Sequence, residues 1–132
     1  MDILELMRSI VNSERAPAPV GPYSHAVVCQ GVVYCSGQLG LDPDTGRLVE
    51  GGTVPETRQS LQNLKAVLES AGSDISKVLR CNIYVIDLSD FTQVNSVYSE
   101  YFPSSPPSRT TVQVAALPKG GRVEIDAIAE VL

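Results

Sequence analysis

The sequence of 132 residues lacks the residue sets from which most metal and redox sites are built. It has one histidine, His25, which excludes a site with several histidine ligands and a relay of two histidines. The three cysteines, Cys29, Cys35 and Cys81, are an odd number without C-x-x-C spacing, and two of them lie in apolar runs, where cysteine acts as a small hydrophobic residue. We therefore expect no metal, and three reduced thiols in an intracellular protein.

Long apolar stretches, basic stretches and phosphate-binding loops are also absent. No apolar run approaches the roughly 20 residues of a membrane-spanning helix, so we expect no membrane association. Ten Lys and Arg against fifteen Asp and Glu give a net charge of −5, and no segment concentrates basic residues, so nucleic acid is not an expected partner. Neither G-x-G-x-x-G nor G-x-x-x-x-G-K-[ST] occurs, which argues against a nucleotide cofactor.

The length suits a single domain, which we place at residues 15–132 after an extension of residues 1–14 whose role is unknown. Apolar residues recur at helical spacing in this extension, which predicts a short amphipathic helix or a docked arm: Ile3, Met7, Ile10 and Val11. Its acidic residues do not suit a secretion signal or a mitochondrial presequence. We expect a cytoplasmic protein, although a mitochondrial location stays open.

The first half of the domain predicts a hairpin followed by a helix. Two β-branched runs, 26–30 and 32–37, are separated by Gly31. The segment Thr53-Val-Pro-Glu56 has the pattern of a capping box, in which the Thr hydroxyl and the Glu carboxylate cap the first turn. Apolar residues then recur with helical period, so we expect a helix over residues 54–71.

The second half predicts a strand, a second helix and two further strands. Residues 77–86 alternate apolar and mixed side chains, and a helix follows that Ser89 caps and that ends before Pro103. Residues 109–116 and 122–131 are the last strands, joined by a glycine-rich turn.

The order β-β-α-β-α-β-β predicts an α+β sandwich of two layers, a mixed sheet with two helices on one face. This follows because crossovers between parallel strands are right-handed. Alternation places the following residues on the helix-free face: Arg80, Asn82, Tyr84, Arg109, Thr111, Gln113, Glu124, Asp126 and Ile128. Such a mixture of charged and apolar groups favours self-association around a symmetry axis.

Two charged residues are the main candidates for chemistry. Arg109 opens a strand after a proline-rich turn, and a guanidinium can bind a small carboxylate through two parallel hydrogen bonds. An ordinary strand-end ion pair is the more common role for such an arginine. Glu124 lies between Val123 and Ile125, so partial burial could raise its pKa towards the range for proton transfer, although a structural carboxylate is again the more common case.

Two loop segments offer weaker candidates. Tyr23 lies in the turn GPYSHA, where a tyrosine usually only packs. Ser36, Gly37 and Gln38 end the second strand, where polar groups leave the ladder and can meet a ligand, and a plain turn explains them equally well. From these residues alone, the sequence indicates an α+β domain with a candidate anion site around Arg109.

Five stretches resemble the Rid family of imine deaminases, also called YjgF or L-PSP proteins: GPYSHA, YCSGQLGLDPDTG, LQNLKAVLESAG, FTQVNSVYSEYFP and PSRTTVQVAALPKGGRVEIDAIA. They agree with the family in order and spacing from about residue 17 to residue 131. The resemblance implies homotrimers of a chorismate-mutase-like fold, with a central β-barrel and with active sites in the clefts between subunits.

The resemblance also implies an activity and its residues. Family members of the deaminating subgroup hydrolyse 2-aminoacrylate, 2-iminopropanoate and 2-iminobutanoate to 2-oxo acids and ammonia, without a cofactor. By the match of motifs, Arg109 binds the substrate carboxylate and Glu124 positions or deprotonates the water. The other residues that would line the cleft are Tyr23 (from the adjacent subunit), Ser36, Gly37, Asn95 and Thr111.

The sequence departs from the family pattern at three positions: His25 replaces a frequent Gln, Asp126 a frequent Glu, and Thr111 a cysteine of some members, which excludes thiol chemistry there. Two other functions stay open. Single-strand endoribonuclease or translation-inhibiting behaviour is reported within the family, but the charge of −5 argues against it. A non-catalytic regulator that binds small acids through the same clefts is the other possibility.

Overall fold

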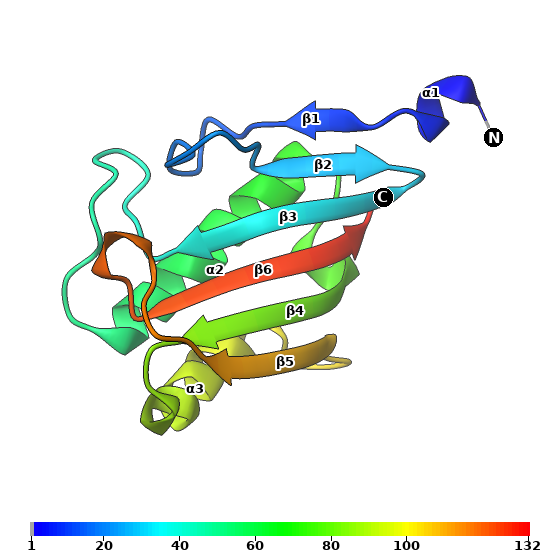
Figure 1. The fold of residues 1–132 in the computed structure, drawn as a ribbon. Coiled ribbons are helices and arrows are strands. Elements are labelled where there is room, and N and C mark those ends of the chain that lie inside the picture. Colours follow the sequence, from blue (N-terminus) through cyan, green and yellow to red (C-terminus); the bar gives the residue numbers. More distant parts are fainter. Residues whose placement is uncertain (1) are drawn as a thin grey trace.

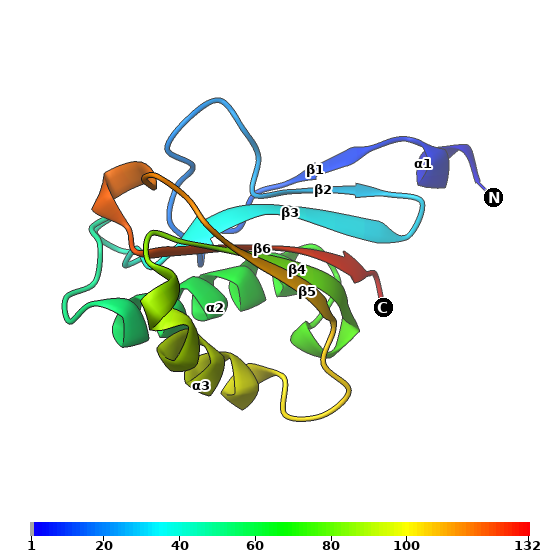
Figure 2. The same ribbon diagram turned by 60° about the horizontal axis from the view of Figure 1, so that its bottom comes forward.

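One mixed sheet with two long helices on a single face makes up the protein in the computed structural model, which describes residues 2–132 (Figures 1 and 2). The strands are β1 Ser9–Val11, β2 Ala26–Cys29, β3 Val32–Leu39, β4 Val78–Val85, β5 Ser108–Gln113 and β6 Val123–Glu130. The helices are α1 Ile3–Leu6, α2 Thr53–Ser70 and α3 Phe91–Tyr101, with 3₁₀ turns at η1 Ile75–Lys77, η2 Leu88–Asp90 and η3 Pro118–Gly120.

The strand order is β1-β2-β3-β6-β4-β5, with β4 and β5 parallel and the other neighbours antiparallel. The predicted two-layer α+β fold is confirmed. The two last strands, which we expected to be joined by a simple turn, do not pair with each other. The chain from β5 crosses back so that β6 lies between β3 and β4, and β6 therefore forms the centre of the sheet.

The predicted capping box at the start of α2 is wrong. The N-cap is Gly52, and the two expected capping side chains bind partners distant in sequence. The Thr53 hydroxyl donates to Asp90 at 2.7 Å and accepts from the Arg122 guanidinium at 2.9 Å, while the Glu56 carboxylate accepts from the backbone N–H of Arg122 at 2.7 Å. These bonds fix the start of β6 against the start of α2.

The second helix begins slightly later than predicted. Ser89 lies inside η2, where its N–H donates to the Asp87 carboxylate at 2.9 Å, and α3 follows from Phe91. The predicted end before Pro103 agrees with the structure. Because α3 connects the parallel strands β4 and β5, it covers this edge of the sheet (Figure 2).

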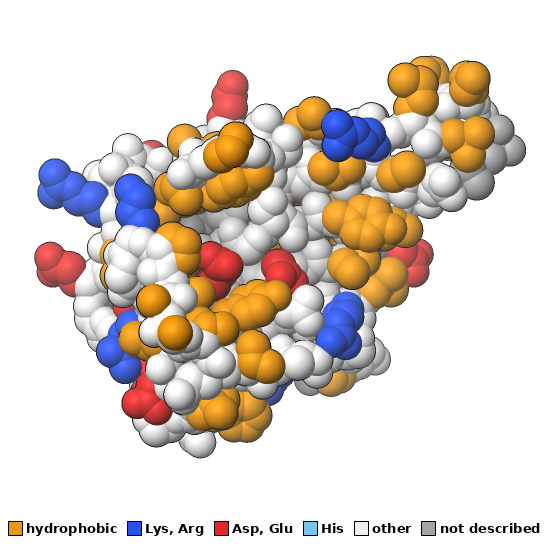
Figure 3. Space-filling view, in the orientation of Figure 1, with side chains coloured by type: hydrophobic (Ala, Val, Ile, Leu, Met, Phe, Trp, Pro, Cys, Tyr) orange, Lys and Arg blue, Asp and Glu red, His pale blue; other side chains and the backbone are white. Residues whose placement is uncertain are grey.

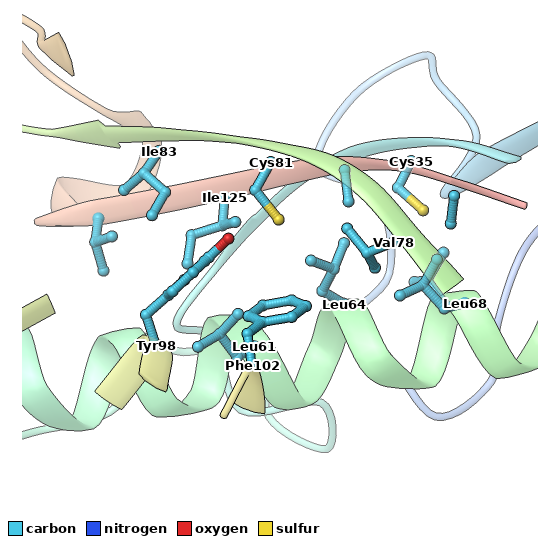
Figure 4. Packing of buried hydrophobic residues seen from close by; sticks show 14 of the residues in the cluster. Cys35, Leu61, Leu64, Leu68, Val78, Cys81, Ile83, Tyr98, Phe102 and Ile125 are labelled. Carbon is cyan, nitrogen blue, oxygen red and sulfur yellow. The ribbon is translucent and has the colours of Figure 1, made fainter. Parts of the chain in front are cut away.

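The hydrophobic core lies between the sheet and the two long helices, with leucines of α2 and aromatic rings of α3 against β4 and β6 (Figure 4). Cys35 and Cys81 are both in it, and the three cysteines are free thiols. Burial raises the pKa of Cys35 to about 12 and that of Cys81 to about 11. Both thiols are therefore protonated at neutral pH and do not act as nucleophiles.

The N-terminal segment begins with α1, which projects past the sheet, and continues into β1, which pairs with β2 at the edge of the sheet (Figure 1). His25, which precedes β2, holds the segment that follows β1 through two hydrogen bonds of its ring. Its ring is buried, with Nδ1 accepting from the Ser13 N–H at 2.9 Å and Nε2 donating to the Pro17 carbonyl at 2.6 Å. Within the described residues, no helix has the length and apolar character needed to cross a bilayer.

Candidate active site

Figure 3 shows the helix-free face of the sheet, where acidic side chains lie in a hollowed region. A hollow of about 320 Å³ on this face is lined by Glu124. Tyr23, Ser36, Gly37 and Pro118 line it with the carboxylate, so the structure brings four of the predicted site residues together. The pairing of β3 with β6 shifts by one residue between Cys35 and Gln38, and this bulge contains Ser36 and Gly37. Bulges redirect side chains and often lie beside functional sites.

The polar groups of this hollow are held in defined positions. The Ser36 hydroxyl donates to the Ser24 carbonyl at 2.6 Å, which leaves its lone pairs for other donors. The Tyr23 hydroxyl accepts from the Val20 N–H at 3.1 Å across the tight turn, which fixes the ring at the rim. The hollow therefore presents hydroxyl groups and a carboxylate to one small space.

Burial raises the pKa of Glu124 above its ordinary range, and the nearby negative charge of Asp126 raises it further. Asp126 lies next along the same face and accepts from the Asn82 amide at 2.9 Å and from the Tyr84 hydroxyl at 3.0 Å. The Glu124 carboxylate accepts no hydrogen bond among the described residues. A carboxylate with a raised pKa and free lone pairs can accept a proton from water.

Gly37 gives the first testable prediction, because a Cβ there would lie 2.6 Å from Oε1 and 2.8 Å from Cδ of Glu124. The obstructing atoms belong to a flexible side chain, so Gly37→Ala should displace the carboxylate while the protein still folds. For the deamination that the family resemblance implies, we expect kcat/KM to fall by roughly 10- to 100-fold, since a displacement of about 1 Å has effects of that order. Steady-state kinetics and thermal unfolding measure the two effects.

The matched control for Gly37→Ala is Gly46→Ala. Gly46 has φ +71 and nothing lies within 4 Å of its added Cβ. This substitution strains a distant loop and should lower stability without changing kcat/KM. Full activity in Gly37→Ala would show that the position of Glu124 does not matter.

Arg109, Thr111 and Gln113 were predicted on the helix-free face, and this prediction is wrong. In the register of β4 with β5, Arg109 pairs with the buried Cys81 and therefore faces the helices, as do Thr111 and Gln113. The physical reason is that β5 is an edge strand with polar residues on both sides, so its sequence does not show which side faces the core. The other predicted members of that face are placed correctly.

The Arg109 side chain lies over α3. Its guanidinium carbon is 4.8 Å from the Tyr98 ring centroid and 5.4 Å from that of Phe91. Together with Asn95, Phe102 and Pro107, among others, Arg109 lines a hollow of about 400 Å³. Asn95 Oδ1 and Thr111 Oγ1 are buried without a hydrogen-bond partner, as is the Tyr98 hydroxyl. The ordinary ion pair considered for Arg109 is absent among the described residues, where the three ion pairs involve other arginines.

The predicted site residues thus form two groups on opposite faces of the sheet. Glu124, Tyr23, Ser36 and Gly37 lie on the helix-free face, whereas Arg109, Asn95 and Thr111 lie on the helix side of the β5 edge. Sequence reasoning missed Phe91 and Tyr98 beside Arg109, and Pro118 beside Glu124. Phe91, Asn95 and Tyr98 share one helical face by their spacing, which was the available signal. No three His, Cys, Asp or Glu side chains of the described part converge on a possible metal position.

Known proteins resemble this chain over nearly its whole length. The family model described as Endoribonuclease L-PSP matches residues 13–131. A 2-iminobutanoate/2-iminopropanoate deaminase of Capra hircus is 52% identical over 124 residues, or 94% of this chain and 90% of the relative. The deaminase of that name from Homo sapiens is 44% identical over the same shares of the two chains. A crystal structure of RidA from the Antarctic bacterium Psychrobacter sp. PAMC 21119 has a TM-score of 0.90 and 44% identity, covering 93% of this chain and 99% of that one. The chain therefore belongs to the Endoribonuclease L-PSP family, the Rid family whose motifs its sequence carries.

Proposed function

We propose that this protein is a deaminase that hydrolyses 2-iminobutanoate, 2-iminopropanoate and 2-aminoacrylate to 2-oxo acids and ammonia. The observation that carries the proposal is that relatives 44–52% identical over 94% of the chain are named 2-iminobutanoate/2-iminopropanoate deaminase. The two hollows supply the groups that this reaction needs, namely a guanidinium with no anionic partner among the described residues and a carboxylate with a raised pKa.

The active site is completed by a second copy of the chain, because one sheet separates Arg109 from Glu124. The helix-free face also carries large apolar residues that are exposed to water in a single chain. Ile10, Tyr34 and Val112 are 59%, 49% and 41% exposed. Figure 3 shows hydrophobic side chains around acidic ones on this face. A homotrimer that packs these faces around a central barrel brings the edge of β5 in one subunit to the Glu124 hollow of the next.

The reaction then follows from the chemistry of the two groups. The Arg109 guanidinium binds the substrate carboxylate through two parallel hydrogen bonds and fixes the imine carbon. Glu124 accepts a proton from water as the oxygen bonds to that carbon, and the electrons of the C=N bond move to nitrogen. The proton passes from Glu124 to nitrogen, which gives a tetrahedral intermediate with one hydroxyl and one amino group. Glu124 then transfers the hydroxyl proton to the amino group, the C–N bond breaks, and ammonia leaves as the C=O bond of the 2-oxo acid forms. 2-Aminoacrylate enters these steps as its imine tautomer, 2-iminopropanoate. These steps consume one imino acid and one water and require no cofactor.

The assay is 2-oxo acid release from freshly generated 2-iminobutanoate, with and without the wild-type protein. We expect clear acceleration over the spontaneous hydrolysis. Binding of 2-oxobutanoate without acceleration would contradict the deaminase and favour the regulator that binds small acids. Internal cleavage of single-stranded RNA into fragments in a parallel assay would favour the endoribonuclease, which the net charge of −5 does not support.

The pH dependence of Asp126→Asn is a prediction of this mechanism. Glu124 acts when ionised, so kcat/KM should rise with pH through its raised pKa and be lost below it. Removing the negative charge of Asp126 lowers the pKa of Glu124, and the acidic limb of the profile should move to lower pH. The control is Glu130→Gln, which changes an exposed carboxylate at the end of β6 and should leave that limb in place. An unchanged limb in Asp126→Asn would show that Glu124 does not set it.

A further inference from the structure

Arg109 is held by the faces of two aromatic rings while its hydrogen-bonding edges remain free. A guanidinium has five N–H donors in its plane. Within the described residues, no ion pair involves Arg109 and no hydrogen bond satisfies these donors, although its side chain is half-buried. The close contacts of the group are the ring faces of Phe91 and Tyr98.

Two rings of α3 lie within cation–π distance of the guanidinium. Phe91 and Tyr98 are seven residues apart on α3, which is close to two turns, so both lie on the same side of the helix. The guanidinium carbon lies 5.4 Å from the Phe91 centroid and 4.8 Å from the Tyr98 centroid. Cations are attracted to ring faces within about 6 Å. This arrangement restricts the orientation of a long side chain without using any of its donors.

The surroundings of Tyr98 make it a rigid support. The residue is 6% exposed, its ring packs against Phe102 in a tilted arrangement with centroids 4.6 Å apart, and it projects from α3 with the hydroxyl towards Cys81 (Figure 4). Burial raises the pKa of Tyr98, so the phenol is neutral at neutral pH and contacts Arg109 as an aromatic ring, not as an anion. Phe91, at 41% exposed, contacts the guanidinium from the first residue of α3.

We propose that Phe91 and Tyr98 are positioning residues that orient the Arg109 guanidinium so that its N–H edges face the substrate carboxylate. The inference rests on the proposed deaminase function, in which Arg109 binds that carboxylate. Neither ring needs to touch the substrate. The rings act on substrate affinity through Arg109, and the step in which water attacks the imine carbon does not involve them.

The test compares Tyr98→Leu, Phe91→Leu and Tyr98→Phe by the Kd of 2-oxobutanoate and by KM and kcat for 2-iminobutanoate. Loss of one ring should raise Kd and KM by roughly 2- to 30-fold, the range of one cation–π contact, with a smaller change in kcat. Tyr98→Phe keeps the ring and should remain within about twofold of wild type. In the Arg109→Ala background, Tyr98→Leu should change Kd no further. Phe91→Leu alters a partly exposed residue and keeps the test valid if Tyr98→Leu does not fold.

Tyr101→Leu is the matched control, since it removes a ring of the same helix whose hydroxyl accepts from Gln62 on α2 at 2.6 Å. It should lower thermal stability and leave Kd unchanged. Wild-type Kd and KM in both Leu variants, with an active wild-type enzyme, would overturn the inference and leave the deaminase intact. An equal loss in Tyr98→Phe would assign the effect to the hydroxyl and also overturn it. A wild-type protein that neither binds 2-oxobutanoate nor turns over would overturn the proposed function itself.

Discussion

Arg109→Ala is expected to lower kcat/KM for 2-iminobutanoate by roughly 10²- to 10⁴-fold, while the protein folds and assembles as the wild type does. Two charge-assisted hydrogen bonds to the substrate carboxylate are lost, each with about 1.5–3 kcal/mol, and each 1.4 kcal/mol corresponds to a factor of ten. Because the guanidinium has no anionic partner among the described residues, its removal leaves no buried charge unpaired. Steady-state kinetics and thermal unfolding separate the two effects.

Two further variants identify what Arg109 contributes. Arg109→Lys keeps the positive charge and loses the paired geometry, so its activity should lie between those of wild type and Arg109→Ala. Arg58→Ala removes a guanidinium from an exposed ion pair with Glu100 on the outside of the helices and should leave kcat/KM unchanged. Wild-type activity in Arg109→Ala would remove this residue from the site and with it the carboxylate anchor.

The sequence predicts the central elements of this fold because their faces differ strongly. In β4 and β6, apolar residues alternate with polar ones, and the buried positions of the structure follow that alternation throughout β6 and from Cys81 onwards in β4. Hence Glu124 and Asp126 could be assigned to the helix-free face before any coordinates. At the start of β4 a register shift buries Val78 and leaves Leu79 exposed. In β5 the segment Arg109-Thr-Thr-Val-Gln113 has polar residues on both sides of an edge strand, and only its pairing with β4 determines which side faces the helices.

Contacts between segments distant in sequence explain the remaining differences. Thr53 and Glu56 have the spacing of a capping box, yet they bind Asp90 and Arg122, which a local pattern cannot reveal. The two aromatic rings beside Arg109 were missed for the same reason. They lie on α3, and α3 contacts β5 through the crossover between the parallel strands β4 and β5. Local patterns therefore predict candidate groups for chemistry, and the pairing of strands decides which of these groups share a face of the sheet.

Mixed trimers are expected to recover activity from two inactive variants. If each site takes Arg109 from one subunit and Glu124 from the next, Arg109→Ala and Glu124→Gln subunits each retain one intact half. Around a ring of three that contains both types, one junction joins an intact Arg109 to an intact Glu124. Mixed trimers should therefore have about a third of the wild-type activity, since one of their three sites is complete. Glu124→Gln should fold well, because a pKa raised by burial means that ionisation of Glu124 at neutral pH disfavours folding.

The experiment uses co-expression with two affinity tags and successive purification on both, so that only trimers with both subunit types are assayed. The controls carry Arg109→Ala on both tags or Glu124→Gln on both tags, and these trimers should stay inactive. Analytical ultracentrifugation establishes that each preparation is trimeric. Activity cannot be recovered within one subunit, because each variant subunit lacks either Arg109 or Glu124. The sheet also separates the two hollows in which these residues lie. Inactive mixed trimers would show that Arg109 and Glu124 do not act together across subunits, and an active monomer would contradict the shared site directly.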